Sequence, residues 1–509
     1  MSGRTSDGTT RVPFLTKHVS IAILAVVYLS FALTFSLLTR AYEADDEQAH
    51  TQYIEYILRH DALPHISAAN LQESHQPPLY YLLTAAWQKL LAIPVFTPVV
   101  VQEHYKNPFI HDRLMLSHNY TATQHQDAVY LHELRLLSVL LGLGTVLLSY
   151  AAAKVAWMRE SVALSVGLFV ALLPRELVVS SSVTNDALVI PLCALALVMF
   201  LFSERARASA RQRHRRLYVL GMGAALGAAA ATKFNSLPVA AVLFVLALTP
   251  SVRLPVRPSN QLLAREAGPT GSLIPSGDPS SGRSAWSASD QAESTDPIGV
   301  GWGLRVDGRA VVDGLIGLIA FFAASGWWFV RNKHLYGQFL ATRASEAYLR
   351  AYFLHPLPWS THLVFEIFPQ TFFVSTWYSQ PNILLPTWMN QALAVAGLLC
   401  LAAGAWALLA AYKWVSPRLP RLSGLALIGC VAAGIVAVLI TIKSTSIGDA
   451  RTAFVGLSAF AVVVVVGTTW LSSRINLRLE LIGLLLWPTA FVAVDLYVLL
   501  HVLIPLGGL

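Results

Sequence analysis

Four side chains capable of chemistry stand together directly after the first long apolar segment: Asp45, Asp46, Glu47 and His50. A carboxylate at the edge of a membrane is costly to keep beside lipid, so it is usually retained for binding or chemistry. It could act as a general base toward a hydroxyl or an amine, or it could help to bind a divalent cation. The alternative is a solvated acidic loop that begins a helix, whose dipole stabilises negative charge. The spacing alone leaves both interpretations open.

Three cations stand at the outer ends of later apolar segments: Lys233, Arg331 and Arg451. The phosphate of a lipid lies at that depth, and cations are less expected on the outer side of a membrane. We therefore expect these side chains to contact a phosphate. The alternative is that each one extends to the water interface or forms an ion pair, for example Arg451 with Asp449.

Two further polar pairs border the outer ends of predicted membrane helices: Arg175-Glu176 and Asn185-Asp186. Charged residues in such positions normally face the interior of a bundle or a polar cavity. We expect a mainly structural role for them, such as an ion pair between Arg175 and Glu176.

The composition indicates a membrane protein. Of the 509 residues, 55% are hydrophobic and only 13% are charged, whereas soluble domains carry nearer 25% charge. The net charge of +8 is spread over short basic clusters between apolar segments, which is typical of membrane topology and not of a nucleic-acid-binding surface. The three cysteines are scattered within apolar segments, so neither a metal motif nor a disulfide framework is expected.

Apolar segments of membrane-spanning length recur along the whole chain. There are about eleven, and they predict an all-α, polytopic bundle of transmembrane helices. The first is expected to be a retained signal-anchor, because it is longer than the apolar part of a usual signal peptide and lacks its cleavage pattern. The expected spans are 19–40, 132–153, 161–178, 185–203, 217–232, 235–250, 310–330, 388–411, 423–442, 452–471 and 479–503.

The distribution of basic residues predicts which side of the membrane each connection faces. Arg4, Arg11 and Lys17 precede the first span, and the connections 204–216 and 413–421 are also basic. Cytoplasmic loops carry an excess of lysine and arginine, so the N-terminus is expected in the cytoplasm. Alternate connections then face outward, including the one with the acidic cluster.

The chain is expected to consist of two membrane modules joined by a linker. Residues 1–250 form the first module, and its outer loop 41–131 carries the carboxylates. Residues 251–309 are rich in Ser, Pro and Gly and lack a sustained apolar period, which predicts a flexible cytoplasmic linker. Residues 310–509 form the second module, with the outer loop 331–387. Both outer loops are expected to contain juxtamembrane helices.

Five motifs follow one another along the chain: Asp46-Glu47-Gln48-Ala49-His50, Leu63-Pro64, His75-Gln76-Pro77-Pro78-Leu79-Tyr80-Tyr81, Asn185-Asp186-Ala187-Leu188, and Arg331-Asn332…Leu335-Tyr336-Gly337. In this order they resemble the C-type glycosyltransferase (GT-C) superfamily. Within it, the chain resembles the bacterial phospholipid-carrier-dependent enzymes related to protein O-mannosyltransferases and aminoarabinose transferases. The resemblance covers most of the chain, apart from the predicted linker.

The resemblance implies a catalytic base in the acidic pair, which corresponds to Asp46 with Glu47 beside it. The preceding Asp45 leaves the register open by one residue. It also implies a polyprenyl-phosphate sugar donor whose phosphate is bound by outer cations. Residues 371–388 depart from the more Gly-rich aromatic pattern of related members, so sugar and acceptor specificity stay open. The expected residues for binding substrate or lipid phosphate are His50, His75, Gln76, Tyr80, Lys233, Arg331 and Arg451.

The resulting hypothesis is a multi-pass glycosyltransferase of the bacterial inner membrane. It would move a sugar from a polyprenyl-phosphate donor to a lipid, glycan or protein acceptor at the outer, periplasmic face. No nucleic-acid partner is expected, and no cofactor is implied beyond a possible divalent cation whose site is unknown. The alternatives are a transporter or flippase of lipid-linked sugars, whose site should lie nearer the membrane midplane, and a non-catalytic protein that binds such lipids.

Overall fold

The computed structural model of the chain describes most of the predicted membrane modules. The predicted linker 251–309 lies outside the described residues except for its last two residues, which begin a helix. The described residues are 14–66, 73–97, 102–107, 110–116, 122–157, 159–209, 211–249, 308–352, 358–377, 379–380, 383–410, 421–445, 448–476 and 479–504.

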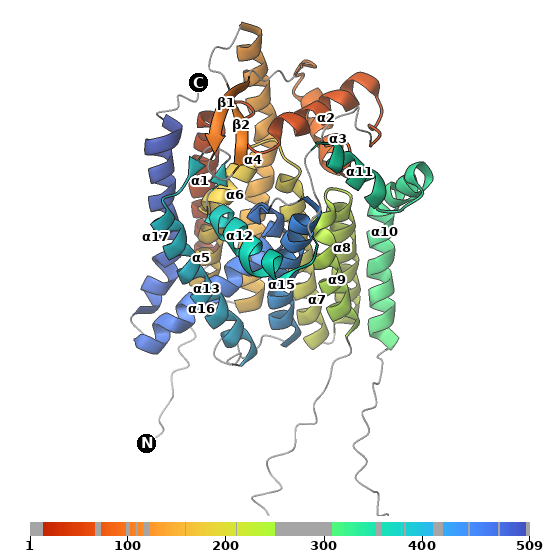
Figure 1. Cartoon of the computed structure of the whole chain (residues 1–509). Helices are drawn as coiled ribbons and strands as arrows, with labels where there is room; N and C mark the ends of the chain where they lie inside the picture. The colour runs from red at the N-terminus through yellow and green to blue at the C-terminus, as the bar shows by residue number, and fades with distance from the viewer. Residues whose placement is uncertain are drawn as a thin grey trace, which may run out of the picture.

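Long helices packed side by side form the bundle, which confirms the predicted all-α fold (Figure 1). Each predicted span falls on a helix or on a pair of consecutive helices. The bundle helices are α1 (Phe14–Leu38), α4 (Ala122–Trp157), α5 (Glu160–Ala171), α6 (Pro174–Ser180), α7 (Asp186–Ala208), α8 (Gln212–Ala230), α9 (Leu237–Leu248), α10 (Gly308–Tyr336), α13 (Thr387–Leu409), α15 (Arg421–Thr445), α16 (Leu457–Ile475) and α17 (Glu480–Val498).

The chain is a multi-pass membrane protein. Eight of the described helices are long and apolar enough to cross a membrane, or up to nine if α5 and α6 form one bent span. The predicted count of eleven also included α8, which begins with several arginines, and α9, which has only 12 residues. The axis bends by 63° between α5 and α6. Pro174 stands at the first turn of α6, where its missing N–H costs no helical hydrogen bond.

The predicted juxtamembrane helices are present, and they gather at one end of the bundle. Figure 1 shows α2, α3 and α11 at this end, while α1 and α10 begin at the opposite end. Two short antiparallel hairpins, which the sequence did not predict, join the helices. These elements are α2 (Glu47–His60), α3 (Leu79–Leu90), β1 (Gln102–Asn107), β2 (Ile110–Leu116), α11 (Thr342–Tyr352), the π-helical turn η2 (Leu363–Ile367), α12 (Phe368–Trp377), β3 (Ser379–Gln380) and β4 (Ile383–Leu384).

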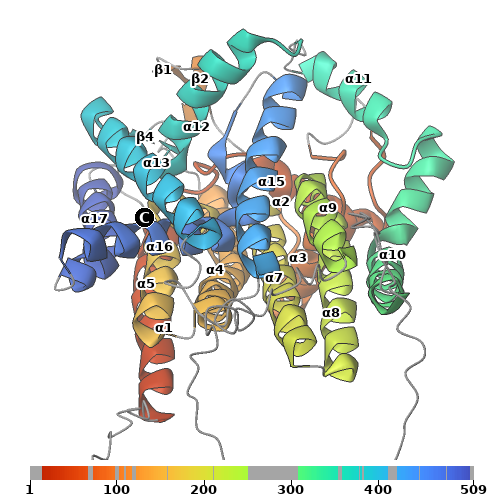
Figure 2. The same ribbon diagram turned by 90° about the horizontal axis from the view of Figure 1, so that it is seen from below.

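Helices α7 and α16 are the most enclosed of the candidate spans, with 78% and 83% of their apolar windows buried. The consecutive valines Val462 to Val466 of α16 are all buried, which suits a central helix surrounded by others. Figure 2 shows the surrounding helices from below. The starts of these two helices are therefore rigid positions for functional groups.

Helices α8 and α10 approach each other closely through glycines. A Cβ atom on Gly223 would lie 2.0 Å from the carbonyl oxygen of Gly317, and one on Gly227 would lie 2.3 Å from that of Phe321. Such Gly-x-x-x-Gly spacing lets two membrane helices pack backbone against backbone. The contact holds α10 against α8, although residues 231–307 separate the two helices in sequence.

We predict that Gly223→Ala lowers the thermal stability of the detergent-solubilised protein, because even a methyl group must separate α8 from α10. Overpacking of this kind costs about 1–3 kcal/mol. The control is Gly326→Ala, also in α10, where a new Cβ would lie 3.8 Å from the Phe322 Cβ, an ordinary van der Waals contact. Equal melting temperatures for the two variants would contradict the proposed close contact.

Candidate active site

Asp46 lies at the junction of α1 and α2, where it is the N-cap residue of α2. Its backbone is left-handed, with φ of 59°. This conformation costs a non-glycine residue about 1–2 kcal/mol, and residues held in it cluster at functional sites. An Asp46 carboxylate oxygen lies 2.5 Å from Nη2 of Arg451, and a third of the Asp46 side chain is exposed. The acid is thus held in place while one side stays accessible.

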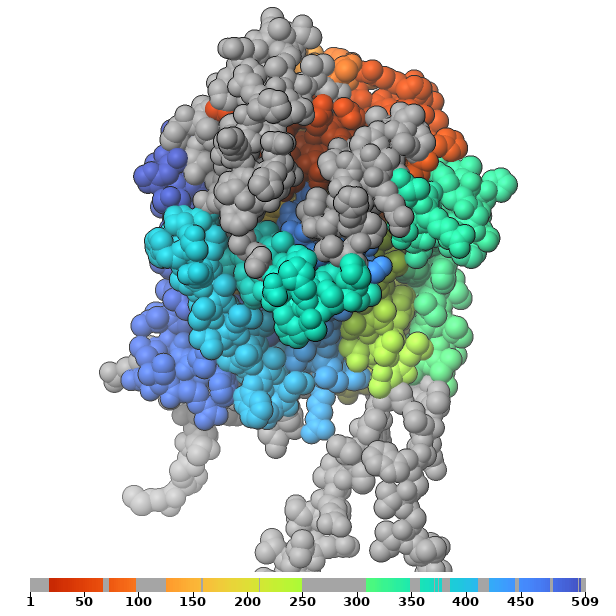
Figure 3. All heavy atoms as spheres, in the orientation of Figure 1, coloured from red at the N-terminus to blue at the C-terminus, as the bar shows by residue number. Residues whose placement is uncertain are grey.

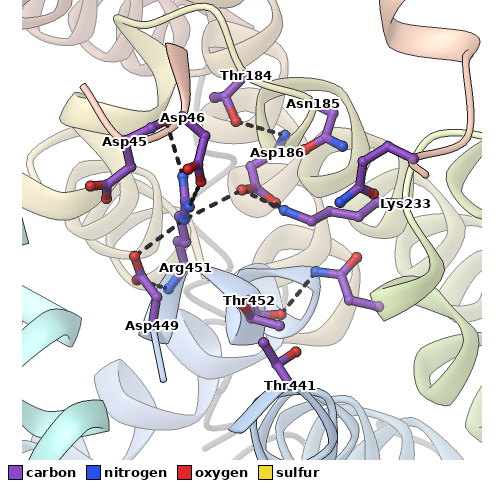
Figure 4. Close-up of polar contacts among 12 residues, drawn as sticks. Asp45, Asp46, Thr184, Asn185, Asp186, Lys233, Thr441, Asp449, Arg451 and Thr452 are labelled. Carbon is purple, nitrogen blue, oxygen red and sulfur yellow. Dashed lines mark hydrogen bonds and ion pairs between the residues drawn. The ribbon is translucent and has the colours of Figure 1, made fainter. Parts of the chain in front are cut away.

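Arg451 lies in η3 (Ala450–Gly456), the 3-10 helical turn that leads into α16. Besides Asp46, its guanidinium faces Asp449, with Nε 3.2 Å from a carboxylate oxygen, and Asp186 at 3.8 Å (Figure 4). Asp449 also caps η3 by accepting a hydrogen bond from the Arg451 backbone N–H at 2.9 Å. One arginine therefore gathers carboxylates from three different parts of the chain.

Lys233 meets the same group from the other side. Its Nζ lies 2.8 Å from both carboxylate oxygens of Asp186, whose side chain is fully buried at the start of α7. Lys233 stands between α8 and the 3-10 turn η1 (Phe234–Ser236). The structure thus brings together Lys233 and Arg451, two of the three cations predicted to bind phosphate.

Arg331, the third predicted cation, has different partners. Near the C-terminal end of α10 its guanidinium donates to the carbonyl oxygens of Leu63 and Pro64 at 3.4 and 3.1 Å. It also lies over the ring of Trp328, 4.9 Å from the ring centroid. These hydrogen bonds therefore link α10 to the connection between α2 and α3 and do not involve the carboxylates around Arg451.

Asp45 is bound by Arg175, which was expected to have a structural role beside Glu176. Nη2 of Arg175 lies 2.7 Å from an Asp45 oxygen and also contacts Asp449. The expected ion pair between Arg175 and Glu176 is absent from the described contacts, and the Glu176 Oε2 atom has no hydrogen-bond partner there. Arg175 is thus part of the site network, because the start of α6 faces the junction after α1.

The Glu47 side chain is fully buried, and each of its two carboxylate oxygens accepts two hydrogen bonds. Arg135 of α4 donates to it from Nε at 2.8 Å and from Nη2 at 2.6 Å. The backbone N–H groups of Val183 and Tyr42 donate to its two oxygens at 2.9 and 3.0 Å. With these four bonds, Glu47 joins α2 to α4 and to the turn before α7. Arg135 was not singled out from the sequence, since it lies inside a long helix.

The predicted binding residues of the first outer loop separate into two groups. His50 is buried beside the acidic cluster, with Nδ1 2.9 Å from the Tyr81 hydroxyl and Nε2 3.4 Å from Thr184 Oγ1. Tyr80, by contrast, is directed to α4, where its hydroxyl lies 3.1 Å from Ser138 Oγ. Tyr81 is therefore the tyrosine of the motif that contacts the predicted site histidine.

His75 and Gln76 contact each other, with Gln76 Nε2 3.1 Å from His75 Nε2. The Gln76 carbonyl oxygen lies 3.5 Å from the Tyr53 hydroxyl. Tyr53 in turn stacks on Tyr81 with ring centroids 3.9 Å apart. These contacts place the His-Gln-Pro-Pro motif against α2, next to His50.

Burial and charge set the protonation states at the site. Burial opposes ionisation of Asp46, but the attraction of Arg451 outweighs it and lowers the pKa of the Asp46 carboxyl. Burial lowers the pKa of His50, against the opposing effect of Glu73 and Asp46. At neutral pH the site therefore presents an ionised Asp46 beside an uncharged His50. The pairing with Arg451 that keeps Asp46 ionised also makes it a weaker base, so it accepts a proton more readily once that pairing is weakened.

The described residues contain no group of three or more His, Cys, Asp or Glu side chains arranged to bind a metal ion. Asp46 and Asp186 are instead paired with Arg451 and Lys233. A divalent cation thus stays a prediction from the sequence.

An apolar cavity lies beside the charged cluster, between α12, α13, α15, η3 and α16. Every side chain that lines it among the described residues is apolar except Thr376. In the space-filling view the teal atoms of α12 lie on the surface of the molecule (Figure 3). The η3 segment contributes Ala453, Phe454 and Gly456 to the wall, immediately after Arg451. The charged cluster and the apolar cavity therefore share one short segment.

The chain matches known proteins in part of its sequence. The family model of dolichyl-phosphate-mannose-protein mannosyltransferases matches residues 117–264, which include α4 to α9. This match confirms the predicted relationship to protein O-mannosyltransferases. A search of curated proteins gave no significant match.

Several solved membrane-protein structures are similar to the chain, each with a TM-score below 0.5. ArnT from Cupriavidus metallidurans bound to undecaprenyl phosphate has 14% identity and a TM-score of 0.46, covering 93% of this chain and 75% of that one. The S. cerevisiae protein O-mannosyltransferase Pmt1-Pmt2 complex bound to the sugar donor has 16% identity and a TM-score of 0.35, covering 68% of this chain and 35% of that one. The Archaeoglobus fulgidus oligosaccharyltransferase tethered with an acceptor peptide has 12% identity and a TM-score of 0.44, covering 96% of this chain and 54% of that one.

We predict that neutralising Glu47 destabilises the protein much more than neutralising the adjacent Asp46. Glu47→Gln breaks a buried charge pair and leaves Arg135 uncompensated, which costs about 3–5 kcal/mol. Asp46→Asn leaves Arg451 with Asp449 as a partner and should change stability little. The measurement is the melting temperature of both variants in the same detergent, and a larger loss for Asp46→Asn would contradict the structural assignment of Glu47.

Proposed function

We propose that this chain is a membrane glycosyltransferase that takes its sugar from a lipid-phosphate donor. The observation that carries the proposal is the double role of η3, which holds Arg451 against Asp46 and forms one wall of the apolar cavity. A lipid-phosphate sugar needs an apolar site for its chain, a cation for its phosphate and a base for the acceptor. The match to the dolichyl-phosphate-mannose-protein mannosyltransferase family supports the same function.

The prenyl chain of the donor would lie in the apolar cavity between α12, α13 and α15. Burial of hydrocarbon there is favourable at about 25 cal/mol per Å² of apolar surface removed from water. The phosphate would then reach Arg451 and, beyond it, Lys233. Both cations are only partly exposed, with 15% and 17% of their side chains accessible, so their attraction for a phosphate is screened less than that of surface residues.

Donor binding would also change the surroundings of Asp46. Arg451 is shared among three carboxylates, and its shortest contact, at 2.5 Å, is to Asp46, the most exposed of the three. A guanidinium carries five N–H donors, so it can keep Asp449 while it binds phosphate oxygens. Competition from the phosphate would weaken its hold on Asp46 and leave that carboxylate free to accept a proton from the acceptor.

The proposed reaction is a single displacement. Asp46 takes the proton from an acceptor hydroxyl or amine while the acceptor atom forms a bond to the anomeric carbon. The bond from that carbon to the phosphate oxygen breaks, and the electron pair stays on the phosphate. Arg451 and Lys233 stabilise the developing negative charge, which is where preorganised cations contribute most to catalysis. Such a displacement inverts the configuration at the anomeric carbon.

Both membrane modules contribute to this site. Asp46, Asp186 and Lys233 belong to the first proposed module, residues 1–250, and Arg451 belongs to the second, residues 310–509. All four stand at helix ends or in the turns beside them. A site at the ends of helices favours transfer at the membrane surface over transport, which would need a site nearer the midplane.

The orientation that we propose follows the basic loops. They place the N-terminus and the linker in the cytoplasm and the acidic site on the periplasmic side of a bacterial inner membrane. The acceptor would then be a lipid, glycan or protein exposed on that side.

We predict that Asp46→Asn lowers transfer by about 10²–10⁴-fold, the usual contribution of a general base. The assay would measure release of undecaprenyl phosphate from undecaprenyl-phosphate-linked sugars by the full chain in membranes, with lipid, glycan and peptide acceptors. The control is Asp61→Asn, the same change at an acid whose side chain is 89% exposed at the end of α2. Near-normal turnover of a membrane-inserted Asp46→Asn protein would rule out this role, and translocation without transfer would favour a transporter.

A further inference from the structure

Two buried oxygen atoms beside the charged cluster have no hydrogen-bond partner among the residues that the structure describes: Oε2 of Glu73 and Oδ1 of Asn185. Only 6% of Glu73 is exposed, and Asn185 is fully buried. Buried polar atoms in folded proteins almost always have a partner, so each exception requires an explanation. In a binding site, one such explanation is a group that arrives with the ligand.

Both residues belong to the surroundings of the proposed phosphate-binding cations. Asn185 directly precedes Asp186, which holds Lys233, and its side-chain N–H lies 3.5 Å from the Tyr81 hydroxyl. Burial raises the pKa of the Glu73 carboxyl, and Asp46, Lys233 and Arg451 are close enough for their charges to act on it. Figure 4 shows Asn185 on the same side of the cluster as Lys233 and Asp186.

The chemistry of the two atoms restricts what can bind them. The Asn185 oxygen accepts hydrogen bonds, and so does the Glu73 oxygen in the ionised form, so the matching ligand groups are O–H or N–H donors. An ionised phosphate and a hydrocarbon chain offer no such donors. The one part of a lipid-phosphate sugar that carries them is the sugar ring, with its hydroxyl or amino groups.

We propose that Glu73 and Asn185 bind O–H or N–H groups of the donor sugar and thereby determine which sugar the enzyme uses. The inference rests on the proposed function, since it assumes a sugar linked to the phosphate at Arg451 and Lys233. The donor would lie across the site, with its chain in the cavity beside η3, its phosphate at the two cations and its ring toward His50. Glu73 and Asn185 would discriminate among sugars, because a ring that lacks the matching O–H or N–H leaves a buried acceptor without a partner.

The test compares two probes on the purified full chain: undecaprenyl phosphate, and undecaprenyl phosphate linked to a hexose, an N-acetylhexosamine or an aminopentose. Dissociation constants are measured by titration in lipid nanodiscs. The wild-type chain should bind at least one sugar-linked lipid more tightly than undecaprenyl phosphate. Glu73→Gln should reduce this preference about tenfold, the effect of one hydrogen bond to a charged group, with the affinity for undecaprenyl phosphate within about twofold.

The matched control is Glu55→Gln, the same change at a buried carboxylate that already accepts hydrogen bonds from Gln88 and the Phe96 backbone. It should leave both affinities unchanged. Glu73→Ala serves as a second variant, and melting temperatures verify that each variant is folded. An unchanged sugar preference in both Glu73 variants would overturn the inference alone. A wild-type chain that binds neither lipid would overturn the proposed function together with it.

Discussion

The contact between Asp46 and Arg451 is the interaction on which the site depends. It joins residues 405 positions apart. Asp46 lies at the start of α2, after the first span, and Arg451 lies at the start of the most enclosed span. An acid that would otherwise lie in a connection between helices is thereby fixed beside the cation proposed to bind phosphate. Because Asp46 is also held in a left-handed conformation, its position relies on tertiary contacts more than on local preference.

The surrounding charges explain why this arrangement is stable without a ligand. Arg175 pairs with Asp45 and Asp449, and Lys233 pairs with Asp186, so each of these cations has a carboxylate partner. Buried charges are costly to desolvate, and breaking one pair leaves the other charge uncompensated. A phosphate can enter such a network only by exchanging with a carboxylate, and Asp46 is the carboxylate with the most exposed side chain of those paired with Arg451. Binding and activation of the base would then be one event.

The sequence predicted the helices, because long apolar segments and basic loops are local signals. It also singled out Asp46, Lys233 and Arg451, since charges at the ends of apolar segments are conspicuous, and the structure brings these three side chains into one charged cluster. It could not predict that Arg135 forms a buried ion pair with Glu47. Nor could it predict that Oε2 of Glu73 is buried without a hydrogen-bond partner among the described residues. Those properties depend on which helix faces which, and a pattern within one helix does not contain that information. For the same reason the sequence could not predict that Arg331 contacts the Leu63 and Pro64 carbonyl oxygens and not the carboxylates around Arg451.

The most direct test is a structure of the full chain with undecaprenyl phosphate, determined by electron cryomicroscopy. Our account predicts the prenyl chain in the cavity between α12, α13 and α15, with phosphate oxygens within about 3.2 Å of the Arg451 guanidinium. The contact between Arg451 and Asp46 should lengthen when the phosphate is bound. A phosphate bound at Arg331, or a chain outside the cavity with the Asp46 contact unchanged, would contradict it.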